Sequence, residues 1–339
     1  MNPRIQEPLC FERIFLEKVW GGRALGNSPD VGGLGLELPD DMPVGETWEL
    51  VDRADVNSQV RSGQFQGARL EELMATSADD LLGRVPAAAN GRFPLLVKYI
   101  DAAAHLSVQV HPDGRLAERH PAWEPKTEAW VILGSTSEGR IYHGFEAGVT
   151  AADFERAVRG GQPIEAMLKS HVPSAGECFF VPGGTVHAIG AGVTLIEVQE
   201  NSDTTFRVDD WGRVGLDGKP RELHVDEALR CLDFAPAPMP VHAPALCEAP
   251  LQLATCAAFS MGLVDVKREL KDRTHQAPRV LAAVRGRGTI ESVAGSFEIA
   301  LGDVVLLPAA LGDFGIKNTS TAPLRLIDMR GPEPASPPA

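Results

Sequence analysis

Long apolar runs, an excess of positive charge and closely spaced cysteines are all missing from this chain of 339 residues. No stretch reaches the roughly 18 consecutive apolar residues of a membrane-spanning helix, so we expect no membrane partner. The formal net charge is -14 at pH 7, and nucleic acids or anionic membrane surfaces would be repelled. We therefore expect no nucleic-acid partner, and any phosphate ligand must meet a local cluster of Lys and Arg.

Cysteine usage and the first residues both predict a cytoplasmic protein. The five cysteines are odd in number and widely spaced, which indicates neither a disulfide framework nor a zinc ribbon or redox loop. We expect reduced, mostly buried thiols. The start, MNPRIQEPLCFERIFLEKVWGG, has scattered charges and no apolar block before a small-residue cleavage site, unlike a secretory signal. The five cysteines are Cys10, Cys178, Cys231, Cys247 and Cys256.

Length and the distribution of Gly and Pro predict a mainly β protein with two packed units, or with one unit and an appendage. The chain exceeds the size of one average core, and its 34 Gly and 26 Pro fall between short β-rich runs such as EAWVIL and DVVLLP. Helical spacing is confined to residues 69–84 and 151–171, the second with Thr150 as a candidate cap. Residues 234–250 are rich in Pro and Ala and fit a linker.

Two segments share one pattern: a glycine and an acid, an apolar strand, a proline six residues after the glycine, then a turn. They are GECFFVPGGTVH at 176–187 and GDVVLLPAALGD at 302–313. Chance similarity of two strand-turn segments is one explanation, and a pair of related β-units is the other. The first copy ends at His187, whereas the second ends at Asp313 and has Ala310 in place of the turn glycine. The second copy therefore fits a site that lost its ligand and kept its scaffold.

The spacing Gly, five residues, Pro, one residue, Gly, two residues, His resembles the second motif of the cupin barrel. The resemblance implies two cupin-like double-stranded β-helix (jelly-roll) barrels with a few peripheral helices. Such barrels pack two sheets together and leave an interior mouth for a ligand. We expect an N-terminal catalytic barrel with helical additions at 1–240, a degenerate barrel at 241–330 and a disordered tail at 331–339.

The densest chemistry lies in the first unit. Gln109 and His111 are two residues apart, so on a strand they project from the same face, and Lys126 and Glu128 repeat this spacing. With His187 they offer two imidazoles, a carboxylate and an amide oxygen, a set suited to zinc or another borderline divalent ion. A single buried histidine is more often a hydrogen-bonded core residue than a metal ligand, so the combination carries the hypothesis.

Four motifs, LSVQVHPD, KTEAW, VPGGTVHAIG and TLIEVQENSDTTFRVDDWGR, occur in this order. Together they resemble the type I mannose-6-phosphate isomerase family in its compact bacterial form, and FLEKVWGG, GETWEL and FPLLVKYIDA extend the resemblance over roughly residues 11–328. Larger members have Pro where this chain has Thr127, which fits a subtype difference at the substrate entrance.

The resemblance implies reversible isomerisation of mannose 6-phosphate and fructose 6-phosphate, with one Zn2+ per chain. It implies an essential Arg207 in TTFRV. The implied metal ligands are Gln109, His111, Glu128 and His187. The implied polar partners are Lys98, Lys126, Glu197 and Asp203.

The reaction suggests roles for these residues. A proton must leave one carbon and return to its neighbour, so a general base is required; Glu197 is the first candidate, with Lys126 and Lys98 as alternatives. Arg207 would neutralise developing oxyanion charge or hold the phosphate by paired hydrogen bonds. We expect Asp203 to orient Arg207.

Three other functions fit parts of the same pattern: a non-catalytic sugar-phosphate-binding cupin, an isomerase of another sugar phosphate, and an iron-dependent oxygenase. Two histidines and a carboxylate are compatible with iron, but the arginine and paired lysines favour an anionic sugar. The expected partner is a small phosphorylated sugar, and the expected assembly is a monomer or homodimer.

Overall fold

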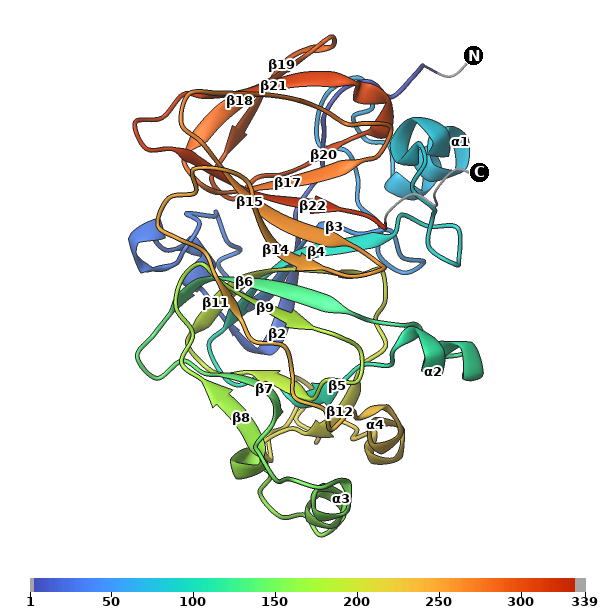
Figure 1. The fold of residues 1–339 in the computed structure, drawn as a ribbon, viewed down its shortest axis with the longest axis vertical. Helices are drawn as coiled ribbons and strands as arrows, with labels where there is room; N and C mark the ends of the chain where they lie inside the picture. Colours follow the sequence, from blue (N-terminus) through green and yellow to red (C-terminus); the bar gives the residue numbers. More distant parts are fainter. Residues whose placement is uncertain (1–2, 333–339) are drawn as a thin grey trace.

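The computed structural model describes residues 3–332 and consists mainly of antiparallel sheets, as predicted. Figure 1 shows two stacked β-units, the N-terminal one in blue to yellow and the C-terminal one in orange to red. Within residues 3–332, no helix has both the length and the apolar character needed to cross a bilayer.

The N-terminal unit is built from two facing sheets. The seven-stranded sheet has the order β13 (Val241–His242), β9 (Glu177–Val181), β6 (Glu128–Ser135), β11 (Val193–Glu200), β4 (Leu95–Ala102), β3 (Val44–Leu50) and β2 (Ile14–Gly22). The five-stranded sheet has the order β12 (Phe206–Asp209), β5 (Val108–Val110), β10 (His187–Ile189), β7 (Ile141–Phe145) and β8 (Leu168–His171).

The C-terminal unit repeats the arrangement with six and four strands. The larger sheet has the order β1 (Leu9–Cys10), β20 (Val304–Leu307), β17 (Arg279–Arg285), β22 (Leu324–Arg330), β15 (Ser260–Val266) and β14 (Leu251–Thr255). The smaller has the order β16 (Glu269–Arg273), β21 (Asp313–Asn318), β18 (Arg287–Ser292) and β19 (Gly295–Ala300).

Within the described residues, four α-helices lie around the sheets (Figure 1), at Leu70–Leu82 (α1), Gly114–Arg119 (α2), Ala151–Arg159 (α3) and Val225–Cys231 (α4). The predicted helix at 69–84 is confirmed as α1. The helix predicted over 151–171 is confirmed at its start, where the Thr150 side chain accepts a hydrogen bond from the Asp153 amide. Its second half was wrong: the helix stops before Gly160, and the chain then forms β8 at the edge of the five-stranded sheet.

The larger sheets of the two units share one apolar core. Val97 and Val131 of the N-terminal unit belong to the same buried cluster as Val280, Leu306 and Met329 of the C-terminal unit. Each Å2 of apolar surface buried from water contributes about 25 cal/mol of stability, so this interface stabilises both units. Two short strands also cross over: β1 pairs with β20, and β13 pairs with β9. The division at residue 240 stays a prediction, and most of the predicted tail, 333–339, lies outside the described residues.

The repeated segments have the same backbone course. Gly176 and Gly302 both adopt positive φ, at 88° and 86°, and each leads into a strand, a turn and a further strand. His187 is fully buried at the start of β10, whereas Asp313 is exposed at the start of β21 and pairs with Arg273 at 2.6 Å. The related β-units are thus visible in the fold, and the second one carries a surface ion pair where the first carries a buried histidine.

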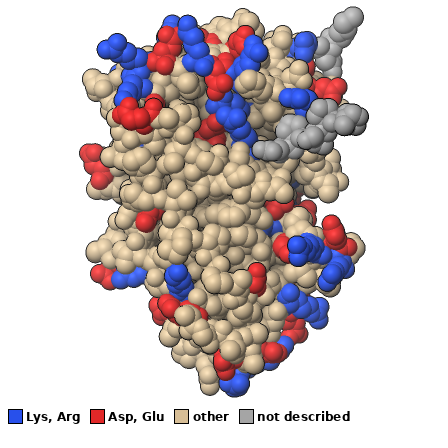
Figure 2. Space-filling model, viewed as in Figure 1, with Lys and Arg blue, Asp and Glu red and all other residues tan. Residues whose placement is uncertain are grey.

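The cysteines are all free thiols, four buried and one partly exposed, as expected. On the face drawn in Figure 2, Lys and Arg are interspersed with Asp and Glu and form no continuous basic surface.

Candidate active site

A cavity of about 280 Å3 lies within the N-terminal barrel. Every predicted site residue except the two histidines lines it. These lining residues are Lys98, Gln109, Lys126, Glu128, Glu197, Asp203 and Arg207. The two histidines lie against this cavity through Glu128, which contacts both.

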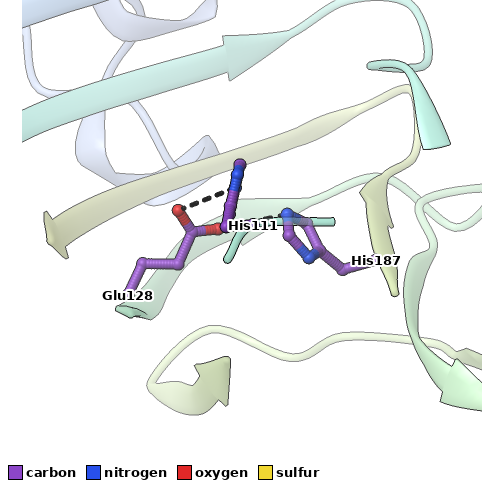
Figure 3. Close-up of side chains that lie close together, drawn as sticks. All are labelled: His111, Glu128 and His187. Atoms are coloured by element: carbon purple, nitrogen blue, oxygen red, sulfur yellow. Dashed lines mark ion pairs between the residues drawn. The ribbon is translucent and has the colours of Figure 1, made fainter. Parts of the chain in front are cut away.

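Three of the four predicted metal ligands converge (Figure 3). His111 follows β5, Glu128 begins β6 and His187 begins β10, so three strands from both sheets supply them. The His111 Nε2 lies 3.4 Å from Glu128 Oε2, and the His187 Nε2 lies 3.3 Å from Glu128 Oε1. One possible ligand atom from each of the three residues lies within 4.8 Å of the other two.

The imidazoles are held in the form that a metal requires. The Nδ1 of His111 lies 2.9 Å from the Thr204 carbonyl oxygen, and the Nδ1 of His187 lies 2.9 Å from that of Thr185. A carbonyl accepts from Nδ1–H, which leaves the lone pair on Nε2. Burial lowers the pKa of His111 to about 4 and that of His187 to about 3, so both rings are neutral near pH 7.

Both Nε2 atoms are buried and make no hydrogen bond of acceptable geometry within residues 3–332. Buried polar atoms are otherwise nearly always hydrogen-bonded, so two unpartnered nitrogens beside one carboxylate require an explanation. Burial alone would raise the pKa of Glu128, but the Lys126 ammonium at 3.1 Å and the histidines outweigh it and lower that pKa well below its usual range. Two neutral nitrogens and an anionic oxygen fit a borderline divalent cation.

Gln109, the fourth predicted ligand, lies on β5 next to the cluster-bearing strand β10. It is the cross-strand partner of His187 on β10 and of Arg207 on β12, and it lines the cavity. Val108 and Val110 are fully buried in a separate apolar cluster. The predicted alternation along this strand is therefore confirmed, and the role of Gln109 as a ligand stays a prediction.

A ladder of charges crosses the cavity floor. Glu197 and Lys98 are cross-strand partners on β11 and β4, with Oε1 and Nζ 3.1 Å apart, and Lys98 also lies 3.8 Å from Glu46. Burial, then repulsion from Glu128, raises the pKa of Glu197 to about 7 despite the attraction of Lys98. Burial would lower the pKa of Lys98, but Glu197 and Glu46 outweigh it and raise that pKa, so the ammonium stays charged.

Arg207 lies at the other side of the cavity. Its Nη1 donates to the Glu222 carbonyl at 2.7 Å, and its Nε is buried without a partner in the described chain. Asp203 is exposed and lines the same cavity, but no hydrogen bond or ion pair joins it to Arg207 within residues 3–332. In this structure Asp203 therefore does not orient that arginine.

Sequence reasoning missed several charged residues of this cavity. Glu46 and Lys18 line it from β3 and β2, inside the motifs GETWEL and FLEKVWGG, where alternate positions on one strand face were the available signal. Burial would raise the pKa of Glu46, but Lys98 and Lys18 outweigh it and lower that pKa to about 2. Arg221 reaches the cavity from a loop and had no such signal.

Comparison with known proteins places this chain in one family. The family model described as phosphomannose isomerase type I, catalytic domain, matches residues 10–131. Mannose-6-phosphate isomerase ManA of Bacillus subtilis (strain 168) is 33% identical over 315 residues, which cover 92% of this chain and 96% of that protein. Mannose-6-phosphate isomerase of Streptococcus mutans is 34% identical over 226 residues, which cover 67% of this chain and 68% of that protein.

Solved structures agree with the sequence relatives. The crystal structure of mannose 6-phosphate isomerase from Bacillus subtilis matches with a TM-score of 0.82 at 28% identity, covering 96% of this chain and 99% of that chain. A variant of phosphomannose isomerase from Salmonella typhimurium shares the fold, with a TM-score of 0.74 at 18% identity over 96% of this chain and 100% of that chain. The sequence resemblance and the two-barrel fold are thereby confirmed, and the chain belongs to the type I phosphomannose isomerase family.

Proposed function

We propose that this family member catalyses the reversible isomerisation of D-mannose 6-phosphate and D-fructose 6-phosphate in the cavity of its N-terminal barrel. The observation that carries the proposal is one cavity lined by a buried Lys98–Glu197 pair and by Glu128, the carboxylate of a His-Glu-His cluster. Membership of the family supports the substrate, because the relatives that match over most of this chain are named for it.

One zinc ion fits the donor set. The residues that would hold it are Gln109, His111, Glu128 and His187. When bound, zinc supplies a Lewis acid without redox activity, which suits a reaction with no net electron transfer.

Glu197 is suited to move the proton between C1 and C2. A general base works best when its pKa lies near the working pH, and burial raises that of Glu197 to about 7. Lys98, 3.1 Å away, holds the carboxylate in place and offers an ammonium to the negative charge that builds on the sugar oxygens. Glu197 is 2% exposed and Lys98 is 8% exposed, so bulk water has little access to either group.

Arg207 and Lys126 complete the charge distribution. Arg207 lines the cavity, where its guanidinium is suited to donate to a sugar oxygen or to the phosphate. Lys126 compensates Glu128 at 3.1 Å and also lines the cavity, so it stays a candidate proton carrier. Asp203, exposed at the mouth, is proposed to contact the substrate directly.

The intact residue set favours an enzyme over a binding protein that has lost turnover, since the buried base and the cationic groups are all present. We further propose that the protein is a cytoplasmic monomer or homodimer. Five free thiols support the reducing compartment.

Interconversion of the two sugar phosphates by the purified chain tests the proposal. We expect the wild-type protein to turn over the substrate and to exchange the C2 proton of mannose 6-phosphate with deuterated solvent. In Arg207→Ala, turnover should fall at least a hundredfold. An exposed ion-paired arginine on α3, Arg159, provides the matched control, since Arg159→Ala should leave turnover unchanged. Binding of the sugar phosphate without turnover or proton exchange would support the binding-protein alternative and contradict the proposal.

A further inference from the structure

The loop between β12 and α4 is tied together by one buried carboxylate. Asp210, at its start, is 6% exposed and accepts hydrogen bonds from two arginines of the same loop. Arg213 donates from Nη2 to Oδ1 at 2.6 Å, and Arg221 donates from Nε to Oδ2 at 2.7 Å and from Nη2 to Oδ1. Burial would raise the pKa of Asp210, but the hydrogen bonds from Arg221 and Arg213 outweigh it and lower that pKa, so the carboxylate stays ionised.

The side-on pairing fixes which donor of Arg221 remains free. Nε and Nη2 face Asp210, whereas Nη1 makes no hydrogen bond within residues 3–332. Arg221 lines the cavity beside Arg207, and its side chain is 25% exposed. Arg213 is anchored separately, because its Nη1 donates to the His105 carbonyl. The pairing with Asp210 therefore leaves Nη1 of Arg221, a residue that lines the cavity, as the donor available to a ligand.

The cluster carries an excess of positive charge. Three guanidinium groups, from Arg207, Arg213 and Arg221, surround the single buried carboxylate of Asp210. Burial, then repulsion from Arg221, lowers the pKa of Arg207, which shows that the two cations influence one another. Glu222 contributes its carbonyl to Arg207, and its exposed carboxylate also attracts Arg207, so three guanidinium groups face two carboxylates and an excess of positive charge remains. A phosphate monoester with a charge of about -1.5 to -2 at pH 7 would balance such an excess.

We propose that Arg221 binds the anionic group of the substrate at the cavity, and that Asp210 is the positioning residue that holds Arg221 there. The inference rests on the proposed function, because it takes the substrate to be a sugar phosphate. Guanidinium groups suit this task because their planar donors match phosphate oxygens.

Steady-state kinetics of Arg221→Met, Asp210→Asn and the double variant test both parts. We expect KM for mannose 6-phosphate to rise about ten- to a hundredfold in Arg221→Met, the loss associated with a charged hydrogen bond, with kcat within about threefold of wild type. Asp210→Asn should raise KM similarly, and the double variant should be no worse than Arg221→Met because Asp210 acts through Arg221. Competitive inhibition by inorganic phosphate should weaken in parallel with the rise in KM.

Three controls keep the outcomes distinct. Arg221→Lys should recover part of the loss, since it keeps the charge without the side-on geometry. Arg159→Met on α3, an exposed arginine paired with Glu155, should leave KM unchanged. Circular dichroism and thermal melting identify any variant that fails to fold; if Asp210→Asn does so, Arg221→Met and Arg221→Lys still decide the binding role.

Unchanged KM and unchanged phosphate inhibition in Arg221→Met would overturn the binding role. Additive effects of Asp210→Asn and Arg221→Met would overturn the positioning role. Absence of turnover in the wild-type protein would instead contradict the proposed function, so the two failures are distinguishable.

Discussion

Zinc should raise the melting temperature of the metal-stripped protein, and the alanine substitution of His187 should abolish that rise. A ligand that binds the folded chain but not the unfolded chain stabilises the fold by about 2.7 kcal/mol when its free concentration is 100 times its Kd. Unfolding 339 residues carries an entropy of about 0.7 kcal/mol/K at the usual per-residue value, so the expected rise is about 4 °C. If the N-terminal unit melts by itself, the entropy is smaller and the rise is larger.

Differential scanning calorimetry of stripped protein with and without zinc measures this shift. His143 supplies a matched control: it is 1% exposed, its ring nitrogens make no hydrogen bond of acceptable geometry among the described residues, and it is the cross-strand partner of His187 on β7. We expect His143→Ala to keep the zinc-induced rise and His187→Ala to lose it. An equal rise in His187→Ala and wild type would refute the assignment of the buried cluster as the metal site.

Three further substitutions, and one control substitution, probe the base, its pKa and the scaffold. Glu197→Gln should lower kcat by about 10²- to 10⁴-fold with little change in KM, measured by steady-state kinetics; a near-normal kcat would exclude Glu197 as the base. A base acts when it is ionised, so activity should fall as the pH drops through about 7, the pKa of Glu197, and a bound cation would lower that pKa. Because the negative charge of Glu46 helps to raise the pKa of Glu197, Glu46→Gln should move the acid limb of the pH–rate profile to lower pH. A move of the acid limb to higher pH would contradict the electrostatics. Asp265→Ala leaves two arginines and the Cys247 amide without their buried acceptor and should lower the free energy of unfolding, measured in urea, by about 3 kcal/mol. The control Glu248→Ala removes an exposed ion pair and should lower it by less than about 1 kcal/mol. Equal losses in the two variants would contradict the burial argument.

Much of the first barrel could be predicted because its signals are local. Residues two apart on a strand share a face, which placed Gln109 and His111 together before any fold was known. The glycine of each repeated segment precedes a strand in the same way, so the repeat predicted two related units. The family motifs then supplied roles that spacing alone left open.

The remaining features depend on contacts between distant parts of the chain. Strands β1 and β13 have two residues each, and short edge strands have no periodicity to reveal which sheet they join. Residues 160–171 keep a helical pattern of apolar residues, but the edge of the five-stranded sheet offers β8 hydrogen bonds that a helix would forgo. Arg221 was missed because its position depends on a loop closing onto Asp210, eleven residues earlier in the chain.

The central claim is that one metal ion, held by the buried His111–Glu128–His187 cluster beside the Lys98–Glu197 pair, is required for the isomerase activity. Its most direct test is the rate of conversion of mannose 6-phosphate to fructose 6-phosphate by the purified protein, before chelation, after chelation and after zinc is restored. We predict that chelation abolishes turnover, that zinc restores it in wild type and His143→Ala, and that it does not in His187→Ala. Full turnover in protein shown by elemental analysis to be free of metal, or restored turnover in His187→Ala, would contradict the account.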